Sequence, residues 1–127
     1  MLREGGHEVA LVARGAHLDA IRSNGIRVIR DTEEFVVVAD LQMTQMKWAP
    51  VDLVLLCVKT YQNQIAIPMM LSLIKENTTV LCLQNGVDSY LAAKKVLGTE
   101  TVLPGAVFLE AARLGPGKSG RPAVWYV

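Results

Sequence analysis

Three polar residues follow apolar runs of strand length and have side chains suited to binding a charged ligand. Arg14 follows the run EVALVA, Lys59 follows VDLVLLCV, and Asn85 lies in the segment LQNG after another apolar run. The two cations suit phosphate or carboxylate groups, and the Asn85 amide can both donate and accept hydrogen bonds. Each residue alone could be solvated, and Asn85-Gly86 is also a common turn dipeptide.

The elements that would position these residues alternate along the chain. Apolar runs predict strands, and amphipathic stretches between them predict helices; the strands are expected over 8–13, 51–58, 79–83 and 101–109, and the helices over 16–23, 62–74 and 88–97. This alternation predicts an α/β fold with a Rossmann-like, doubly wound, mostly parallel sheet. Ligands of such sheets bind beyond the carboxyl ends of the strands, where the three polar residues fall.

Several segments carry more specific expectations. Residues 26–41 alternate apolar and polar residues around a polar turn at 30–33, which predicts a β-hairpin or a pair of short strands rather than a helix. Pro68 predicts a kink in the helix over 62–74. The Gly-Pro-Gly of residues 115–117 predicts a turn, with 123–127 returning as the hairpin partner. The Gly5-Gly6 pair predicts that the chain opens in the last turn of a helix.

Composition bounds the class of protein. The chain has 127 residues, 51% hydrophobic, with net charge +1 and mean hydropathy +0.30, typical of one globular domain. Its basic residues are scattered, which argues against nucleic-acid binding. Cys57 and Cys82 lie in apolar runs without metal-ligand spacing, so we expect buried, reduced thiols and no metal. No apolar run reaches the roughly 18 residues of a membrane span, and the expected compartment is the cytoplasm.

The position of Arg14 indicates a cofactor. In a dinucleotide-binding fold, the residue that ends the second strand meets the adenosine ribose. An Arg at this position accommodates a 2′-phosphate, whereas an acidic residue would accept a hydrogen bond from the 2′-hydroxyl. Arg14 therefore favours NADP over NAD, and Gly15 with the start of the next helix would add backbone N–H groups for the same anion. His17 could stack near the adenine or simply face solvent.

The second expected cluster lies at the ends of the next strands. Lys59 could meet a carboxylate, a cofactor phosphate or a ribose, and Asn85 could hold the nicotinamide ribose or a substrate oxygen. Gln84 and Gly86 flank Asn85 and are predicted to belong to the same cofactor site.

The segments GHEVALVARGAHLDAIRSNGIRV, DLVLLCVKTYQ and LCLQNGVDSYLAAKKVLG, in this order, resemble the ketopantoate reductase (2-dehydropantoate 2-reductase) family over nearly the whole chain through about Gly105. The resemblance implies that Arg14 binds the NADP 2′-phosphate and that Lys59 and Asn85 line the nicotinamide and substrate pocket. It also implies NADPH-dependent reduction of a 2-oxo acid, ketopantoate to pantoate in pantothenate and coenzyme A biosynthesis.

Two departures from the family pattern shape the expectations for the chain. The family opens with a strand and a GxGxxG turn, and its general-acid lysine lies in a helical C-terminal domain. Residues 1–127 contain neither the GxGxxG turn nor the C-terminal domain. We therefore interpret residues 1–127 as a partial dinucleotide-binding domain that is inactive or nearly inactive alone. Alternatives are a related NADP-dependent 2-oxo or 3-hydroxy acid reductase, or a non-catalytic fragment acting as an interaction module through unpaired strand edges. The expected partner is a small 2-oxo acid, with neither nucleic acid nor membrane, and a homodimer remains open.

Overall fold

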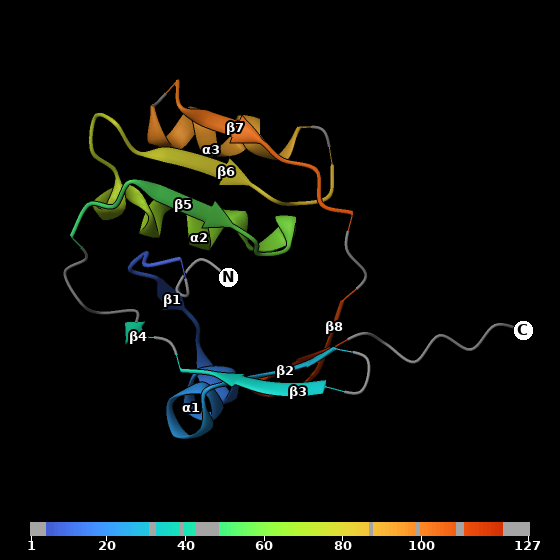
Figure 1. Cartoon of the computed structure of the whole chain (residues 1–127). Helices are drawn as coiled ribbons and strands as arrows, with labels where there is room; N and C mark the ends of the chain where they lie inside the picture. Colours follow the sequence, from blue (N-terminus) through green and yellow to red (C-terminus); the bar gives the residue numbers. More distant parts are fainter. Residues whose placement is uncertain are drawn as a thin grey trace, which may run out of the picture. The chain divides into compact units, whose positions relative to one another are not determined.

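The chain forms two units, each with its own strands and helices (Figure 1). The computed structural model describes residues 5–30, 33–38, 40–42, 49–86, 88–98, 100–108 and 111–120. The first unit comprises Met1–Met46 with Leu109–Val127, and the second comprises Lys47–Phe108.

The first unit begins with a strand followed by a helix, as predicted. β1 (Ala10–Val12) is shorter than the expected strand and pairs in parallel with β4 (Asp40–Gln42), a strand that the sequence analysis did not separate from the hairpin. α1 (Gly15–Asn24) buries Leu18 and Ile21, which are three residues apart and so share one face of the helix.

The predicted hairpin is present but belongs to a larger sheet. β2 (Ile26–Arg30) and β3 (Glu33–Val37) pair antiparallel. β8 (Ala112–Gly115) and β9 (Lys118–Gly120) form a second antiparallel hairpin, and β9 pairs in parallel with β2 to give the order β3-β2-β9-β8. The turn over 115–117 is thus confirmed, but residues 118–120 are the partner of β8. The predicted return strand over 123–127 lies outside the described residues, as do residues 1–4 of the predicted helical turn.

The second unit is a three-stranded parallel sheet with helices on one face. β5 (Leu53–Leu56), β6 (Thr79–Cys82) and β7 (Val102–Pro104) follow in that order, and α2 (Asn63–Met69) and α3 (Ser89–Leu97) form the connections. The helices and strands share one apolar core: Leu56, Ile67, Met70, Leu73, Val80, Cys82, Ala93 and Val102. Parallel strands joined by helices confirm the α/β prediction, although the described strands form three separate sheets.

Alternation along β5 separates the two faces of this sheet. Leu56 is buried in the core and Val54 packs against it, whereas Leu53 and Leu55 are 47% and 41% exposed. Cys57 continues the exposed register and is itself exposed, so the expectation that both thiols are buried is wrong for Cys57 and correct for Cys82. The uninterrupted apolar run did not reveal that only one face of the sheet is covered within this unit.

Pro68 shortens the helix predicted over 62–74. A 3₁₀ turn at Thr60–Gln62 precedes α2, and another at Leu71–Leu73 follows it. Pro68 lies inside α2 and has no N–H to donate, and from Met70 onward the chain tightens to bonds spanning three residues, such as Met70 N–H to the Ile67 carbonyl at 3.0 Å.

Candidate functional site

The second unit brings Lys59 and Asn85 to one pocket, as the sequence predicts. The pocket has a volume of about 150 Å³ and lies where β5 and β6 end; it is lined by Cys57, Val58, Lys59, Thr60, Leu83, Gln84 and Asn85. Register explains the convergence, because parallel pairing places Leu56 opposite Cys82, and Lys59 and Asn85 each follow their strand by three residues. Both side chains are exposed at the pocket and available to a ligand.

Gln84 lies beside this pocket but its amide is engaged by the protein. Its side chain is only 9% exposed, and its Nε2 donates to the Val58 carbonyl at 2.6 Å and to Asn63 Oδ1 at 2.7 Å. Asn63 Nδ2 donates back to Gln84 Oε1 at 3.2 Å. The bond to the Val58 carbonyl links the segment that carries Lys59 to the segment that carries Asn85. The geometry therefore supports a role for Gln84 in positioning these two residues, and a direct contact between Gln84 and a cofactor stays a prediction.

Asn63 is a residue that the sequence analysis missed. It begins α2, is 9% exposed, and makes both of its side-chain bonds to Gln84, which is 21 residues away in the sequence. A buried asparagine needs hydrogen-bond partners, but nothing in the local pattern TYQNQ identifies them.

Gly86 supplies a turn after Asn85. Its φ of 107° lies in the region that favours glycine, and its carbonyl accepts a hydrogen bond from the Ser89 hydroxyl at 3.1 Å. Gly86 therefore shapes the connection from β6 to α3, and its predicted contact with a cofactor is untested.

Partial desolvation affects the exposed thiol in the pocket wall. The pKa of Cys57 is raised by desolvation, as is that of Cys82 in the core. A raised thiol pKa means less thiolate at neutral pH, which lowers the nucleophilicity of Cys57. Among the described residues, no group of three or more His, Cys, Asp or Glu side chains is placed to hold a metal ion.

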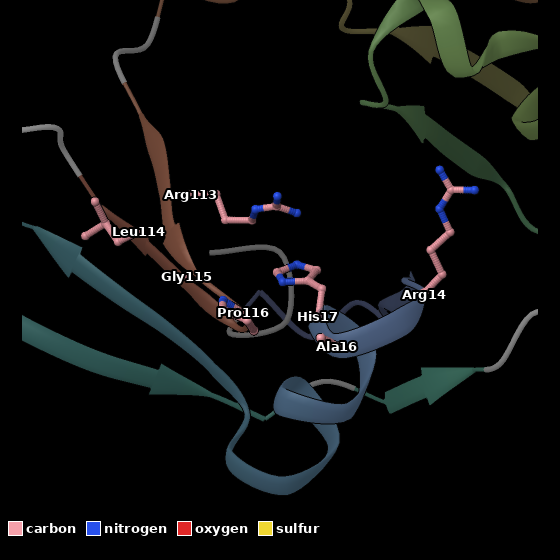
Figure 2. A pocket seen from close by; sticks show the side chains of 7 residues that line it. All are labelled: Arg14, Ala16, His17, Arg113, Leu114, Gly115 and Pro116. Atoms are coloured by element: carbon pink, nitrogen blue, oxygen red, sulfur yellow. The ribbon is translucent and has the colours of Figure 1, made fainter.

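Arg14 lines a second pocket, which belongs to the first unit (Figure 2). The pocket has a volume of about 390 Å³ and is lined by Arg14, Ala16, His17, Arg113, Leu114, Gly115 and Pro116. Arg14 is the N-cap residue of α1, has extended backbone angles, and its side chain is exposed. Gly15, at φ 57°, has no atom within 4 Å of the place where a Cβ would be, so the backbone there is open to an approaching ligand.

His17 and Arg113 join Arg14 at this pocket. His17 Nδ1 accepts a hydrogen bond from the Gly117 N–H at 2.9 Å, so the imidazole is partly buried between α1 and the β8–β9 turn and does not simply face solvent. Arg113 comes from β8. The sequence analysis did not identify it, because Arg14, the other arginine that lines this pocket, is distant in the chain.

Parallel strands joined by helices, with cationic and amide side chains at the strand ends, define the class as a Rossmann-like α/β protein. Solved structures agree with this class. The chain aligns with 2-dehydropantoate 2-reductase from Geobacter metallireducens at a TM-score of 0.83 and 29% identity, over 94% of this chain and 40% of that one. A ternary structure of D-mandelate dehydrogenase with NADH and anilino(oxo)acetate aligns at a TM-score of 0.86 and 27% identity, over 96% of this chain and 40% of that one.

Sequence comparison supplies the family. Residues 1–122 match the family described as ketopantoate reductase PanE/ApbA, and this chain belongs to it. The 2-dehydropantoate 2-reductase of Lactococcus lactis is 31% identical over 122 residues, and that of Mesorhizobium japonicum is 35% identical over 83 residues. The chain spans 39% and 26% of the lengths of these two relatives. No helix in the described part of the chain is long and apolar enough to cross a bilayer.

Proposed function

We propose that this chain is the nucleotide-binding part of an NADPH-dependent reductase that converts 2-dehydropantoate to pantoate. Membership of the ketopantoate reductase family supports the reaction class. The observation that carries the proposal is the pocket in which Lys59 and Asn85 meet at the ends of β5 and β6. A cation next to a neutral amide suits a ligand that has both an anionic group and a hydroxyl or carbonyl oxygen.

Each side chain of this pocket has a defined task in the proposed reaction. NADPH supplies the hydride when it is bound. Lys59 presents an ammonium group with three donors, which would orient a carboxylate or ribose oxygen and favour negative charge as it develops on the reacting oxygen. Asn85 would hold a second oxygen in a fixed direction. The Asn63–Gln84 pair keeps the two segments that carry these residues in register.

The choice of NADPH rests on the pocket of the first unit. Arg14 offers a guanidinium at the start of α1, and among the described residues no carboxylate pairs with it. A 2′-phosphate would meet this guanidinium through charge-assisted hydrogen bonds, whereas NADH would leave it without an anion.

The test is a calorimetric titration of the purified chain with NADPH and, in parallel, with NADH. We expect tighter binding of NADPH. Arg14→Ala should weaken it by about 10- to 100-fold, the equivalent of about 1.5–3 kcal/mol for hydrogen bonds to a charged group. NADH binding should change little. Arg22→Ala is the matched control, because Arg22 is exposed in the last turn of the same helix. Equal binding of both nucleotides by the folded chain would contradict the NADPH assignment.

A second candidate is a related 2-hydroxy acid dehydrogenase that uses NADH. It is favoured by the D-mandelate dehydrogenase neighbour, whose solved complex contains NADH and a 2-oxo acid. The same titration separates the two candidates: preference for NADH, unaffected by Arg14→Ala, would support the dehydrogenase and contradict the NADPH reductase.

A further inference from the structure

The pocket of the first unit has two walls that come from distant parts of the sequence. The start of α1 supplies Arg14, Ala16 and His17, and the β8–β9 hairpin supplies residues 113–116. Figure 2 shows Arg14 and His17 projecting from the start of α1 and Arg113 projecting from β8, with the guanidinium of Arg14 turned away from the other two side chains in this view. The pocket is therefore complete only when the hairpin is folded against the helix.

The hairpin is held firmly in this place. His17 Nδ1 accepts from the Gly117 N–H at 2.9 Å, and the Gly117 carbonyl accepts from the Arg27 N–H at 2.8 Å. Gly117 is buried, has φ 67°, and a Cβ there would lie 3.2 Å from the Cβ of Ala20. Glycine thus allows the turn to approach α1 closely, and the two hydrogen bonds of Gly117 hold the β8–β9 turn against α1 and β2.

A bulge lies next to Arg113 in the β8–β9 hairpin. The β8–β9 register shifts between Arg113, which is opposite Ser119, and Gly115, which is opposite Lys118. Such bulges re-aim the side chains beside them and often lie next to binding sites.

The charges at this pocket are unbalanced within the described residues. Three ion pairs elsewhere satisfy Arg27, Lys75 and Lys94 with carboxylates, but no described carboxylate pairs with Arg14 or Arg113. Because His17 Nδ1 accepts a hydrogen bond, the neutral imidazole carries its proton on Nε2, which becomes a further donor. Two guanidinium groups and an imidazole N–H fit a phosphate monoester, whose charge at neutral pH approaches two.

We propose that Arg113 is a specificity-determining residue that binds the 2′-phosphate of the nucleotide together with Arg14, and that His17 both donates to this anion and clamps the hairpin. This inference rests on the proposed function for the identity of the nucleotide. It adds that selection of the phosphate depends on β8, almost at the other end of the described chain from Arg14.

The experiment measures binding of three probes to the full chain by calorimetry: adenosine 2′,5′-bisphosphate, adenosine 5′-monophosphate and inorganic phosphate. For the unaltered chain we expect the bisphosphate to bind most tightly. Arg113→Ala should weaken the bisphosphate about 10-fold and leave the 5′-monophosphate unchanged, and Arg113→Lys should recover part of the loss because it keeps the charge without the bidentate fork. Arg22→Ala controls for loss of positive charge near α1.

The outcomes separate this inference from the proposed function. One outcome overturns the inference alone: the unaltered chain prefers the bisphosphate, Arg14→Ala loses this preference, and Arg113→Ala keeps it. Arg113 would then have no part in selecting the 2′-phosphate. If the unaltered chain shows no preference for the 2′-phosphate, the NADPH assignment fails and the inference fails with it. Inorganic phosphate binding as tightly as the bisphosphate would indicate a general anion site and also overturn the nucleotide role.

Discussion

The buried amide pair between Asn63 and Gln84 allows a quantitative test of how the second pocket is held together. Asn63→Leu removes one partner of the buried Gln84 amide and leaves its Oε1 without a hydrogen bond, which costs about 2 kcal/mol of unfolding free energy. Gln84→Leu leaves Asn63 unpaired and also removes the donor to the Val58 carbonyl, so its cost should be about 3 kcal/mol. The double substitution leaves only the Val58 carbonyl unpaired, and we expect a cost of about 2 kcal/mol, against about 5 kcal/mol for independent residues.

Urea unfolding followed by far-ultraviolet circular dichroism measures this coupling of about 3 kcal/mol. The m-value should stay constant across the three variants, since the same surface is exposed on unfolding. A double variant that loses the full sum of the single losses would refute the reasoning, as would single losses below about 0.5 kcal/mol. NADPH affinity supplies the functional readout: if the pair positions Lys59 and Asn85, the double variant should remain folded and still bind NADPH more weakly than the unaltered chain.

Two further predictions concern a thiol and a glycine. Cys57 should react with iodoacetamide, whereas Cys82, 1% exposed, should not. Because partial desolvation raises the pKa of Cys57, its rate of alkylation should rise at a higher pH than that of a free thiol such as glutathione. NADPH should slow the reaction by covering the pocket, and mass spectrometry can follow the modification. Gly25→Ala should cost about 3 kcal/mol in urea unfolding, because φ 72° and ψ −176° are essentially glycine-only and the new Cβ would lie 2.8 Å from a Val36 methyl carbon and 2.9 Å from a backbone oxygen. Gly98→Ala is the control, because Gly98 also has a positive φ but has open space around it, and it should cost only about 1 kcal/mol. If both variants lose the same free energy of unfolding, the contacts around Gly25 do not matter.

The residues at strand ends were predictable because they depend on short-range information. An apolar run predicts a buried strand, and the residue that ends the run must lie at the edge of the sheet. Parallel pairing then brings such residues together without further detail, which is why Lys59 and Asn85 meet as expected. The helix expected from residue 16 is present as well, and α1 begins one residue earlier, at Gly15.

The contacts that support these residues were not predictable, because they join distant segments. Nothing in the sequence around Asn63 or Gln84 indicates that the two amides pair across 21 positions. The hydrogen bond between His17 and Gly117 spans 100 positions, and Arg113 reaches its pocket only through that packing. The exposed thiol of Cys57 was mispredicted for a related reason: an apolar run shows that a strand is buried but not on how many faces.

The proposed cofactor preference depends both on Arg14, which can be recognised from the sequence, and on contacts between distant segments, which cannot. A neighbour solved with NADH has the same backbone arrangement at a TM-score of 0.86, so the fold alone does not select between a ribose 2′-hydroxyl and a 2′-phosphate. Under the proposed function, selection would therefore depend on side chains at the start of α1 and on the residues that pack beside it. Arg14 is visible in the sequence, but the attraction of one exposed guanidinium for an anion is screened by salt. A second guanidinium on the β8–β9 hairpin raises the local positive potential, and this is the physical reason to expect that Arg113→Ala acts on nucleotides that carry the 2′-phosphate and spares those that lack it.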